Sequence, residues 1–158
     1  MINRDRPVTS RGLLVTGTDT GVGKTLVATA LLRAMAGRGL RAVGMKPVAA
    51  GCALSAEGLV NEDVVQLVRA STFEAPRDWI NPYCFQPPVA PHLAARAAGQ
   101  VISLQRITAA YGRLSRLADR VVVEGAGGLL VPLNEKEDFA DLARLLHLPV
   151  VLVVGMRL

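Results

Sequence analysis

The sequence contains few of the residues that mark several large classes of protein. Aromatic residues make up only 4% of the chain, too few for the base-stacking surface of a single-strand nucleic-acid binder. The longest apolar run, residues 149–156, is far shorter than the roughly 20 residues of a membrane-spanning helix. The first residues lack the charged start, apolar stretch and small-residue cleavage site of a secretory signal. We therefore expect a cytoplasmic protein that binds neither nucleic acid nor membranes.

Cysteine and histidine are also scarce, with two residues of each. Cys52 and Cys84 do not have the spacing of a C-x-x-C or metal motif, and in a reduced compartment we expect no disulfide framework. His92 is expected at the start of a helix with its ring satisfied by the backbone, and His147 is expected to be structural. Neither a His/Cys metal cluster nor a Ser–His–Asp order stands out. The chemistry must therefore come from other residue types.

Lysine is the least used of the common charged residues. The 158 residues carry a formal net charge of +5, but the arginines are scattered and form no basic block with aromatic neighbours, so the charge does not indicate nucleic-acid binding. Three of the 18 basic residues are lysines, namely Lys24, Lys46 and Lys136. Lys24 and Lys46 fall within motifs marked by glycine or proline, which makes them candidate functional residues.

The pattern of apolar residues predicts an α/β fold. Hydrophobic residues make up 51% of the chain, enough for a buried core. Unbroken apolar runs predict buried strands at residues 12–16, 41–46, 121–124 and 149–154. Helical periodicity and capping residues predict helices that begin near residues 23, 61, 103 and 139, whereas residues 72–91 are expected to form an ordered loop. Non-alternating strands separated by helices indicate a mostly parallel sheet covered on both faces, which is a doubly wound architecture.

The clearest motif is a glycine-rich loop, Gly17-Thr-Asp-Thr-Gly-Val-Gly-Lys-Thr25, between the first predicted strand and the first predicted helix. The backbone N–H groups of such a loop and the positive end of the helix dipole can hold a phosphate chain, and Lys24 can reach its β- and γ-phosphates. Thr25 can place its hydroxyl on Mg²⁺. The loop has one residue more than the standard spacing between its first glycine and Gly-Lys. The alternative is a glycine-rich turn with a solvated lysine.

Two further motifs place charged residues at the ends of predicted strands. Val121-Val-Val-Glu124 ends in a carboxylate followed by glycines, and Met45-Lys-Pro-Val48 places Lys46 where the second strand ends. Because the carboxyl ends of parallel strands share one edge, both side chains are expected to face the same crevice as Lys24. A surface glutamate before a turn and a lysine that reaches solvent remain the alternatives. Asp63 could join the crevice or merely complement the dipole of its helix.

Six sequence blocks occur in the order, and at about the spacing, found in dethiobiotin synthetases, at residues 17–25, 45–48, 61–63, 81–83, 90–93 and 123–128. From about Leu13 to its last residue the chain therefore resembles this family. The resemblance implies a P-loop NTPase-like, ATP-binding domain over residues 12–158, preceded by a flexible lead-in at residues 1–11. Relative to the family this domain would lack the C-terminal strand–helix units, so either the sequence is cut short or this form cannot bind the adenine base in the usual way.

This resemblance implies an ATP-dependent cyclo-ligase of biotin biosynthesis. Such an enzyme joins CO₂ to 7,8-diaminononanoate and closes a ureido ring, which gives dethiobiotin, ADP and phosphate. One amine of the substrate becomes a carbamate, ATP converts the carbamate to a carbamic–phosphoric anhydride, and the second amine attacks it. The family uses Mg²⁺ with ATP as co-substrate, and its members are homodimers with the diamine bound near the subunit interface.

The resemblance also implies roles for individual residues. Lys24 and Lys46 are the implied catalytic residues, Lys24 neutralising the phosphates and Lys46 bridging the carbamate and the γ-phosphate. The implied Mg²⁺ ligands are Thr25, Asp63 and Glu124. The implied ATP-binding residues are Gly21, Val22, Gly23, Lys24, Thr25, Leu26, Asp63, Glu124, Gly125, Ala126 and Gly127. The implied substrate-binding residues are Thr20, Lys46 and Ala50.

Two positions depart from the family, and two other functions stay open. Many relatives have an acidic residue at the position of Gly21 and a hydroxyl residue at the position of Ala50, which cannot donate a hydrogen bond. Amide ligases similar to cobyrinate or cobyric acid synthases share the loop type, but they carry a glutaminase domain that this sequence does not show. Partition-type ATPases, which act as nucleotide switches, have an additional lysine where this chain has Asp19, so its absence argues against a switch.

Overall fold

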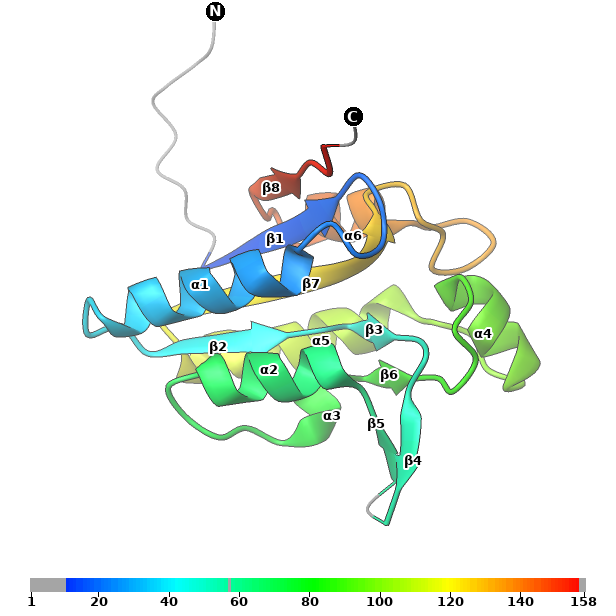
Figure 1. Cartoon of the computed structure of the whole chain (residues 1–158), viewed down its shortest axis with the longest axis horizontal. Coiled ribbons are helices and arrows are strands. Elements are labelled where there is room, and N and C mark those ends of the chain that lie inside the picture. The colour runs from blue at the N-terminus through cyan, green and yellow to red at the C-terminus, as the bar shows by residue number, and fades with distance from the viewer. Residues whose placement is uncertain (1–10, 57, 157–158) are drawn as a thin grey trace, which may run out of the picture.

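The computed structural model describes residues 11–56 and 58–156 of the chain. Within this part, a central parallel sheet has the strand order β2-β7-β1-β8. Its strands are β1 (Gly12–Gly17), β2 (Ala42–Met45), β7 (Arg120–Gly128) and β8 (Val150–Val153). Helices α1 (Lys24–Ala36) and α2 (Glu62–Ala70) cover one face, and α5 (Leu104–Leu117) and α6 (Phe139–Leu145) cover the other (Figure 1). The predicted doubly wound α/β fold is confirmed.

Alternate residues of the central strands face the two helical layers. Val15 and Val122 pack in one cluster with Leu32 and Leu67 of α1 and α2. The neighbouring residue Leu14 belongs to the second cluster, which also contains side chains of α5 and α6. These clusters are buried on both faces because crossover helices lie on both sides of a parallel sheet, which explains why the strands read as unbroken apolar runs.

The predicted helix starts near residues 61 and 103 are confirmed by side-chain caps. The Asn61 side chain accepts hydrogen bonds from the backbone N–H groups of Asp63 and Val64 at the start of α2. The Ser103 side chain accepts one from Arg106 at the start of α5. Each cap satisfies N–H groups that have no partner within the helix, which is why these residue types mark helix starts.

Short elements occupy residues 72–91, for which the sequence predicted a loop, and residues 48–60, for which it made no prediction. The predicted loop at residues 72–91 contains α3 (Arg77–Ile80) and β6 (Tyr83–Cys84), and α4 (Pro91–Ala97) begins at its end. β6 pairs in parallel with β3 (Val48–Ala49), while β4 (Ala53–Ser55) and β5 (Gly58–Val60) form an antiparallel pair. The prediction of a loop is wrong where α3 and β6 lie. Elements of two to four residues are too short to show a periodic pattern of apolar residues, which is why the sequence did not reveal them.

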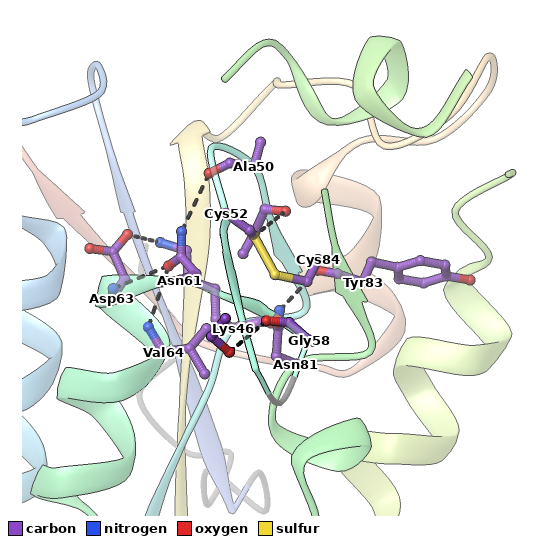
Figure 2. The surroundings of a disulfide bond; sticks show 12 residues. Lys46, Ala50, Cys52, Gly58, Asn61, Asp63, Val64, Asn81, Tyr83 and Cys84 are labelled. Carbon is purple, nitrogen blue, oxygen red and sulfur yellow. Dashed lines mark hydrogen bonds and ion pairs between the residues drawn. A yellow bond between two sulfur atoms is a disulfide. The ribbon is translucent and has the colours of Figure 1, made fainter. Parts of the chain in front are cut away.

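The two cysteines form a disulfide, Cys52–Cys84, so the expectation of no disulfide is wrong (Figure 2). The residues are 32 positions apart, and their Cα atoms lie 6.3 Å from each other, within the range of a disulfide. They meet because β3 and β6 pair, which places Ala49 opposite Cys84. Spacing along the sequence could not reveal this pairing.

The strand at the edge of the sheet also differs from its prediction. β8 was expected to be buried, but its residues alternate between exposed and half-buried because, among the described strands, it has β1 as its single neighbour. No helix in the described part of the chain is long and apolar enough to cross a membrane.

The two histidines differ in outcome. His92 lies in the first turn of α4, as predicted, but its buried Nδ1 has no hydrogen-bond partner among the described residues, so the expected backbone contact is wrong. His147 lies between α6 and β8 with a φ of 51°, in the left-handed region, and its backbone N–H donates to the carbonyl of Arg144. His147 thus has a place in the turn that leads into the edge strand.

Candidate active site

A cavity of about 690 Å³ opens at the carboxyl-terminal edge of the central sheet. Its lining comes from the loop after β1, the ends of β2 and β7, the start of α2 and the segment before α4. The lining residues are Thr20, Gly21, Gly23, Lys24, Thr25, Lys46, Ala50, Asp63, Pro88, Val89, Ala90, Pro91, Glu124, Ala126, Gly127 and Val131. The three strand-end motifs predicted to share a crevice therefore do so.

The loop after β1 ends in a helix start that is left open. Gly23 precedes α1 with a φ of 100°, and Gly21 has a φ of 76°, both in the region that favours glycine. Within the described residues, α1 has neither a side-chain cap nor an acidic residue in its first turn. Its first N–H groups and its dipole therefore present partial positive charge to the cavity, which suits an anion such as phosphate.

Lys24 lies at the first position of α1, and its side chain turns back over the loop. Its Nζ donates a 2.7 Å hydrogen bond to the backbone carbonyl of Asp19, and only 6% of the residue is exposed. Burial, followed by repulsion from the ammonium of Lys46, lowers the pKa of Lys24 below its usual value, although Glu124 and Asp63 act in the opposite direction. The cavity thus holds a lysine whose charge would be favoured by a bound anion.

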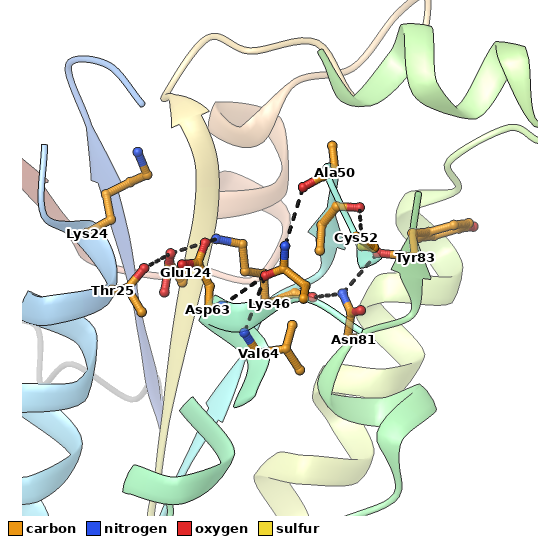
Figure 3. A network of polar contacts seen from close by, with 12 residues as sticks. Lys24, Thr25, Lys46, Ala50, Cys52, Asp63, Val64, Asn81, Tyr83 and Glu124 are labelled. Atoms are coloured by element: carbon orange, nitrogen blue, oxygen red, sulfur yellow. Dashed lines mark hydrogen bonds and ion pairs between the residues drawn. The ribbon is translucent and has the colours of Figure 1, made fainter. Parts of the chain in front are cut away.

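Lys46 forms the centre of a buried ion-pair network (Figure 3). Its Nζ lies 2.5 Å from Asp63 Oδ2 and 2.7 Å from Glu124 Oε1. The contact with Glu124 follows from the register of the sheet, because Met45 of β2 lies opposite Val123 of β7 and the next residues are Lys46 and Glu124. One ammonium therefore pairs with two carboxylates, of which Glu124 is fully buried and Asp63 is partly exposed at the cavity.

Thr25 and Asp63 complete this network from the starts of two helices. Thr25 Oγ1 donates a 2.9 Å hydrogen bond to Glu124 Oε1. Burial alone would raise the pKa of Asp63, but the charge of Lys46, its hydrogen bond, and smaller contributions from Thr25 and Lys24 outweigh it, so the pKa lies below the usual value. Asp63 is therefore the ionised partner of Lys46 rather than only a helix-dipole residue.

The oxygen atoms of this network are the kind that Mg²⁺ prefers. No group of three or more His, Cys, Asp and Glu side chains gathers within the described residues, so the donors are the two carboxylates and the Thr25 hydroxyl. The second oxygen of Glu124, Oε2, is buried and has no hydrogen-bond partner in the described part of the protein. Mg²⁺ binds through few carboxylates and keeps waters or phosphate oxygens as its other ligands, so the residues present fit this ion.

Most of the residues predicted to bind nucleotide line the cavity, but three do not. Among the described residues, Val22, Leu26 and Gly125 lie outside the lining, and Leu26 is 72% exposed on α1. The predicted substrate residues Thr20 and Ala50 both line it, and the carbonyl of Ala50 accepts a 3.3 Å hydrogen bond from Asn61 Nδ2. Residues outside the lining can still contact a ligand through their backbone atoms.

Residues 126 and 127 reach the cavity because β7 is irregular there. Val15 of β1 lies opposite Glu124, but Gly17 lies opposite Gly128, so β7 contains more residues than β1 between these pairs. The surplus residues bulge from the ladder, and Ala126 and Gly127 line the cavity. The glycines after Glu124 were the sequence signal for this bulge.

The opposite side of the cavity consists of Ala50 and residues 88–91 and is called here the disulfide-linked wall. Ala50 was a predicted substrate residue, but sequence reasoning gave residues 88–91 no role in the site. Its two segments are joined by the Cys52–Cys84 bond and by backbone hydrogen bonds from Gly51 to Pro87 (3.2 Å) and from Cys52 to Phe85 (2.9 Å). The prolines at 87, 88 and 91 marked an ordered segment. Nothing in their pattern placed that segment against the glycine loop.

Comparison with known proteins agrees with this geometry. Residues 11–158 match the AAA domain family. The curated ATP-dependent dethiobiotin synthetase BioD of Aromatoleum aromaticum is 54% identical over 94% of this chain and 66% of its own length. Proteins of the same name from Nitrosospira multiformis and Xylella fastidiosa are 55% and 54% identical over 94% and 91% of this chain, each over 64% of its own length. The chain thus spans slightly less than two thirds of these relatives, and the predicted resemblance is confirmed.

Proposed function

Because this chain belongs to the AAA domain family, we propose that it forms the nucleotide-binding and carbamate-activating part of an ATP-dependent dethiobiotin synthetase. Its substrates would be ATP, CO₂ and 7,8-diaminononanoate, and the reaction would close a ureido ring. The relatives of that name support this assignment, and they give no support to a cobyrinate-type amide ligase or a switch ATPase.

One observation carries the proposal: Lys24 and Lys46, which come from different elements, line one cavity together with Thr25, Asp63 and Glu124. A reaction that joins a carbamate to the γ-phosphate of ATP must bring two anions together, and their mutual repulsion opposes this. Two ammonium groups on lysines that are themselves buried reduce the repulsion and hold both reactants in position. A purely structural role would not require two lysines at one edge of the sheet.

The residues would divide the work by position. The open start of α1 and Lys24 would bind the phosphate chain, since both present positive charge on the loop side. Lys46 would meet the carbamate and the γ-phosphate, which would compete as anions with Asp63 and Glu124 for its ammonium. The second amine would then attack the activated carbamate carbon, and phosphate would leave as an anion that the same lysines stabilise.

Thr25, Asp63 and Glu124 are the residues that we propose hold Mg²⁺. When bound, the ion supplies positive charge that neutralises phosphate oxygens. Burial raises the pKa of Asp63, but the charge of Lys46 outweighs burial and the pKa lies below its usual value. This carboxylate is therefore available as an anionic ligand at neutral pH. The unpartnered Oε2 of Glu124 supports the same role.

Two further parts of the proposal concern the whole protein. We propose that it acts in the cytoplasm as a homodimer, as its resemblance to the family implies. Light scattering coupled to size-exclusion chromatography of the full-length protein tests the homodimer, and a mass of one chain across the tested concentrations would contradict it.

The test of the reaction is ADP release from ATP by the full-length protein. We expect release only when both 7,8-diaminononanoate and bicarbonate are present, with dethiobiotin formed in equal amount. Omission of either substrate is the internal control. ADP release at the same rate with and without the diamine would favour a nucleotide switch. A requirement for glutamine would favour an amide ligase.

A further inference from the structure

At Lys46 the chain leaves the central sheet and enters the small sheet formed by β3 and β6. β2 pairs with β7 up to Met45, and after two intervening residues β3 begins at Val48 and pairs with β6. Pro47, between these strands, has no N–H group to donate. The Lys46 N–H donates a 2.8 Å hydrogen bond to the carbonyl of Ile80, which lies in neither sheet. The peptide that carries Lys46 therefore depends on contacts from the segment at residues 80–83.

The side-chain amide of Asn81 connects the two sheets at this point (Figure 3). Its Nδ2 donates hydrogen bonds to the carbonyl of Lys46 at 2.7 Å and to the carbonyl of Tyr83 at 2.9 Å. Both contacts are buried, and 6% of Asn81 is exposed. One amide thus links the carbonyl of Lys46 to the start of β6, next to the backbone hydrogen bond that the Tyr83 N–H donates to the Pro47 carbonyl at 3.1 Å.

The orientation of this amide has a clear cause. The two carbonyl oxygens near Asn81 can only accept hydrogen bonds, so the NH₂ group must face them, because the opposite orientation would place oxygen against oxygen. The Oδ1 atom is consequently buried without a hydrogen-bond partner among the described residues. An unmet acceptor costs stability, and this cost is tolerated because both donors are used.

We infer that Asn81 is a positioning residue for Lys46: it fixes the backbone from which the lysine reaches Asp63 and Glu124. The Lys46 ammonium lies within 2.5 and 2.7 Å of these carboxylates, so a small rotation of its peptide would separate them. Asn81 does not line the cavity and would not touch a substrate. The kinetic consequence of this inference rests on the proposed function, but the position of Lys46 does not.

The direct test measures Lys46 itself. The 158 residues contain three lysines, and protein labelled with ¹³C at the lysine ε-carbon gives an NMR signal for each of them. In Asn81→Ala we expect the Lys46 signal to shift or broaden, because its ammonium loses a fixed distance to two carboxylates, while the Lys136 signal stays in place. A folded Asn81→Ala protein with an unmoved Lys46 signal would overturn the inference.

Asn134 offers a matched control. Its Nδ2 also donates to a backbone carbonyl, that of Ile102 at 3.0 Å, and to Glu137 at 2.7 Å, but it lies outside the cavity. Asn134→Ala removes the same chemical group and should leave the Lys46 signal unchanged. If both variants moved Lys46 equally, the effect would be general loosening and the inference would fail.

The kinetic test uses dethiobiotin formation by the full-length protein. Asn81→Ala should lower kcat by roughly 10- to 100-fold, as small misplacements of reacting groups do. The loss of affinity for ATP should be smaller than the loss in kcat, because Lys24 and its loop still bind the phosphate chain although Lys46 meets the γ-phosphate. A kcat equal to that of the unaltered protein would contradict positioning. If the unaltered full-length protein forms no dethiobiotin, the proposed function is rejected. A Lys46 signal that moves in Asn81→Ala would still support the positioning role in that case.

A second variant separates positioning from folding. In Asn81→Asp the ionised carboxylate cannot donate to the Lys46 carbonyl, whereas the protonated form regains one donor. We therefore expect the kcat of Asn81→Asp, divided by that of the unaltered protein at each pH, to rise as the pH is lowered, while the ratio for Asn81→Ala stays flat. Equal, flat ratios for both variants would count against the inference, and circular dichroism checks that each variant is folded.

Discussion

The two sides of the cavity are built in different ways. The phosphate wall, residues 20–25 with residues 124–127, continues long elements of the central sheet and its first helix. The disulfide-linked wall depends on the two-residue strands β3 and β6, which a covalent bond and the amide of Asn81 hold together. Strands of two residues form few hydrogen bonds with each other, so the contacts that hold them together must come from side chains.

This contrast explains how far the sequence could predict the molecule. The phosphate wall follows from one contiguous motif between a strand and a helix, and the rules for parallel sheets then place Lys46 and Glu124 beside it. The disulfide-linked wall depends on a pairing between residues 48–49 and 83–84, and no local pattern encodes that long-range contact. The role of Asn81 is likewise invisible, because its partners are backbone carbonyls, which every residue has.

The largest expected effect comes from removing either of the two lysines that line the cavity. Lys24→Ala and Lys46→Ala should each lower the rate of dethiobiotin formation by at least about 10²-fold, as loss of one donor to a transition state does. Steady-state assays of the full-length protein measure this. Lys136→Ala, at an exposed lysine, is the control and should keep normal turnover. Rates like those of the unaltered protein for both cavity variants would defeat the assignment.

Loss of Lys46 should also destabilise the protein more than loss of Lys24. Glu124 is fully buried, and without Lys46 its charge has lost its closest counter-ion. Removing one partner of a buried ion pair costs roughly 3–5 kcal/mol of unfolding free energy. Within the described residues the Lys24 ammonium donates to a backbone carbonyl and forms no ion pair. Denaturant unfolding of both alanine variants measures the difference. Restored stability in Lys46→Ala combined with Glu124→Gln would verify the cause, and equal losses in the two single variants would contradict it.

The disulfide-linked wall should respond to reduction, and the phosphate wall should not. Replacing both cysteines with serine removes the cross-link between residues 32 positions apart, and we expect a loss of about 2–4 kcal/mol in unfolding free energy. Denaturant curves with and without reductant measure it. The double serine variant is the control, since reductant should not change its curve. An intact mass that shows two free thiols after alkylation of the native protein would exclude the bond.

The lowered pKa of Lys24 predicts a pH effect on the phosphate wall. Burial and the charge of Lys46 favour the neutral amine, so Lys24 loses its proton at a lower pH than the usual lysine value of 10.5. Affinity for ATP should therefore fall as the pH rises through that lowered pKa, by up to about tenfold per pH unit. Calorimetric titration of ATP across alkaline pH measures this, and Lys24→Arg, which stays protonated, should not show the same decline. A constant affinity up to the usual lysine pKa would refute the prediction.

The smallest expected effect concerns acid stability at Asp63. Its pKa is lowered in the folded protein, since the charge of Lys46 outweighs the effect of burial. Ionised Asp63 therefore contributes stability above its unfolded pKa, and this contribution is lost as the pH falls through the folded value. The difference in unfolding free energy between the unaltered protein and Asp63→Asn should shrink as the solution is acidified. A difference that does not change with pH would contradict this coupling.

The bond between Cys52 and Cys84 closes a covalent ring that contains Asp63 and Asn81 but not Lys24, Lys46 or Glu124. A protease that cuts the oxidised chain once inside this ring, for example in the exposed strand β4, would release no fragment. Electrophoresis would show one band without reductant and two bands with it. The same cut made before residue 52 or after residue 84 would separate the pieces at once, so limited proteolysis can map the boundaries of the ring.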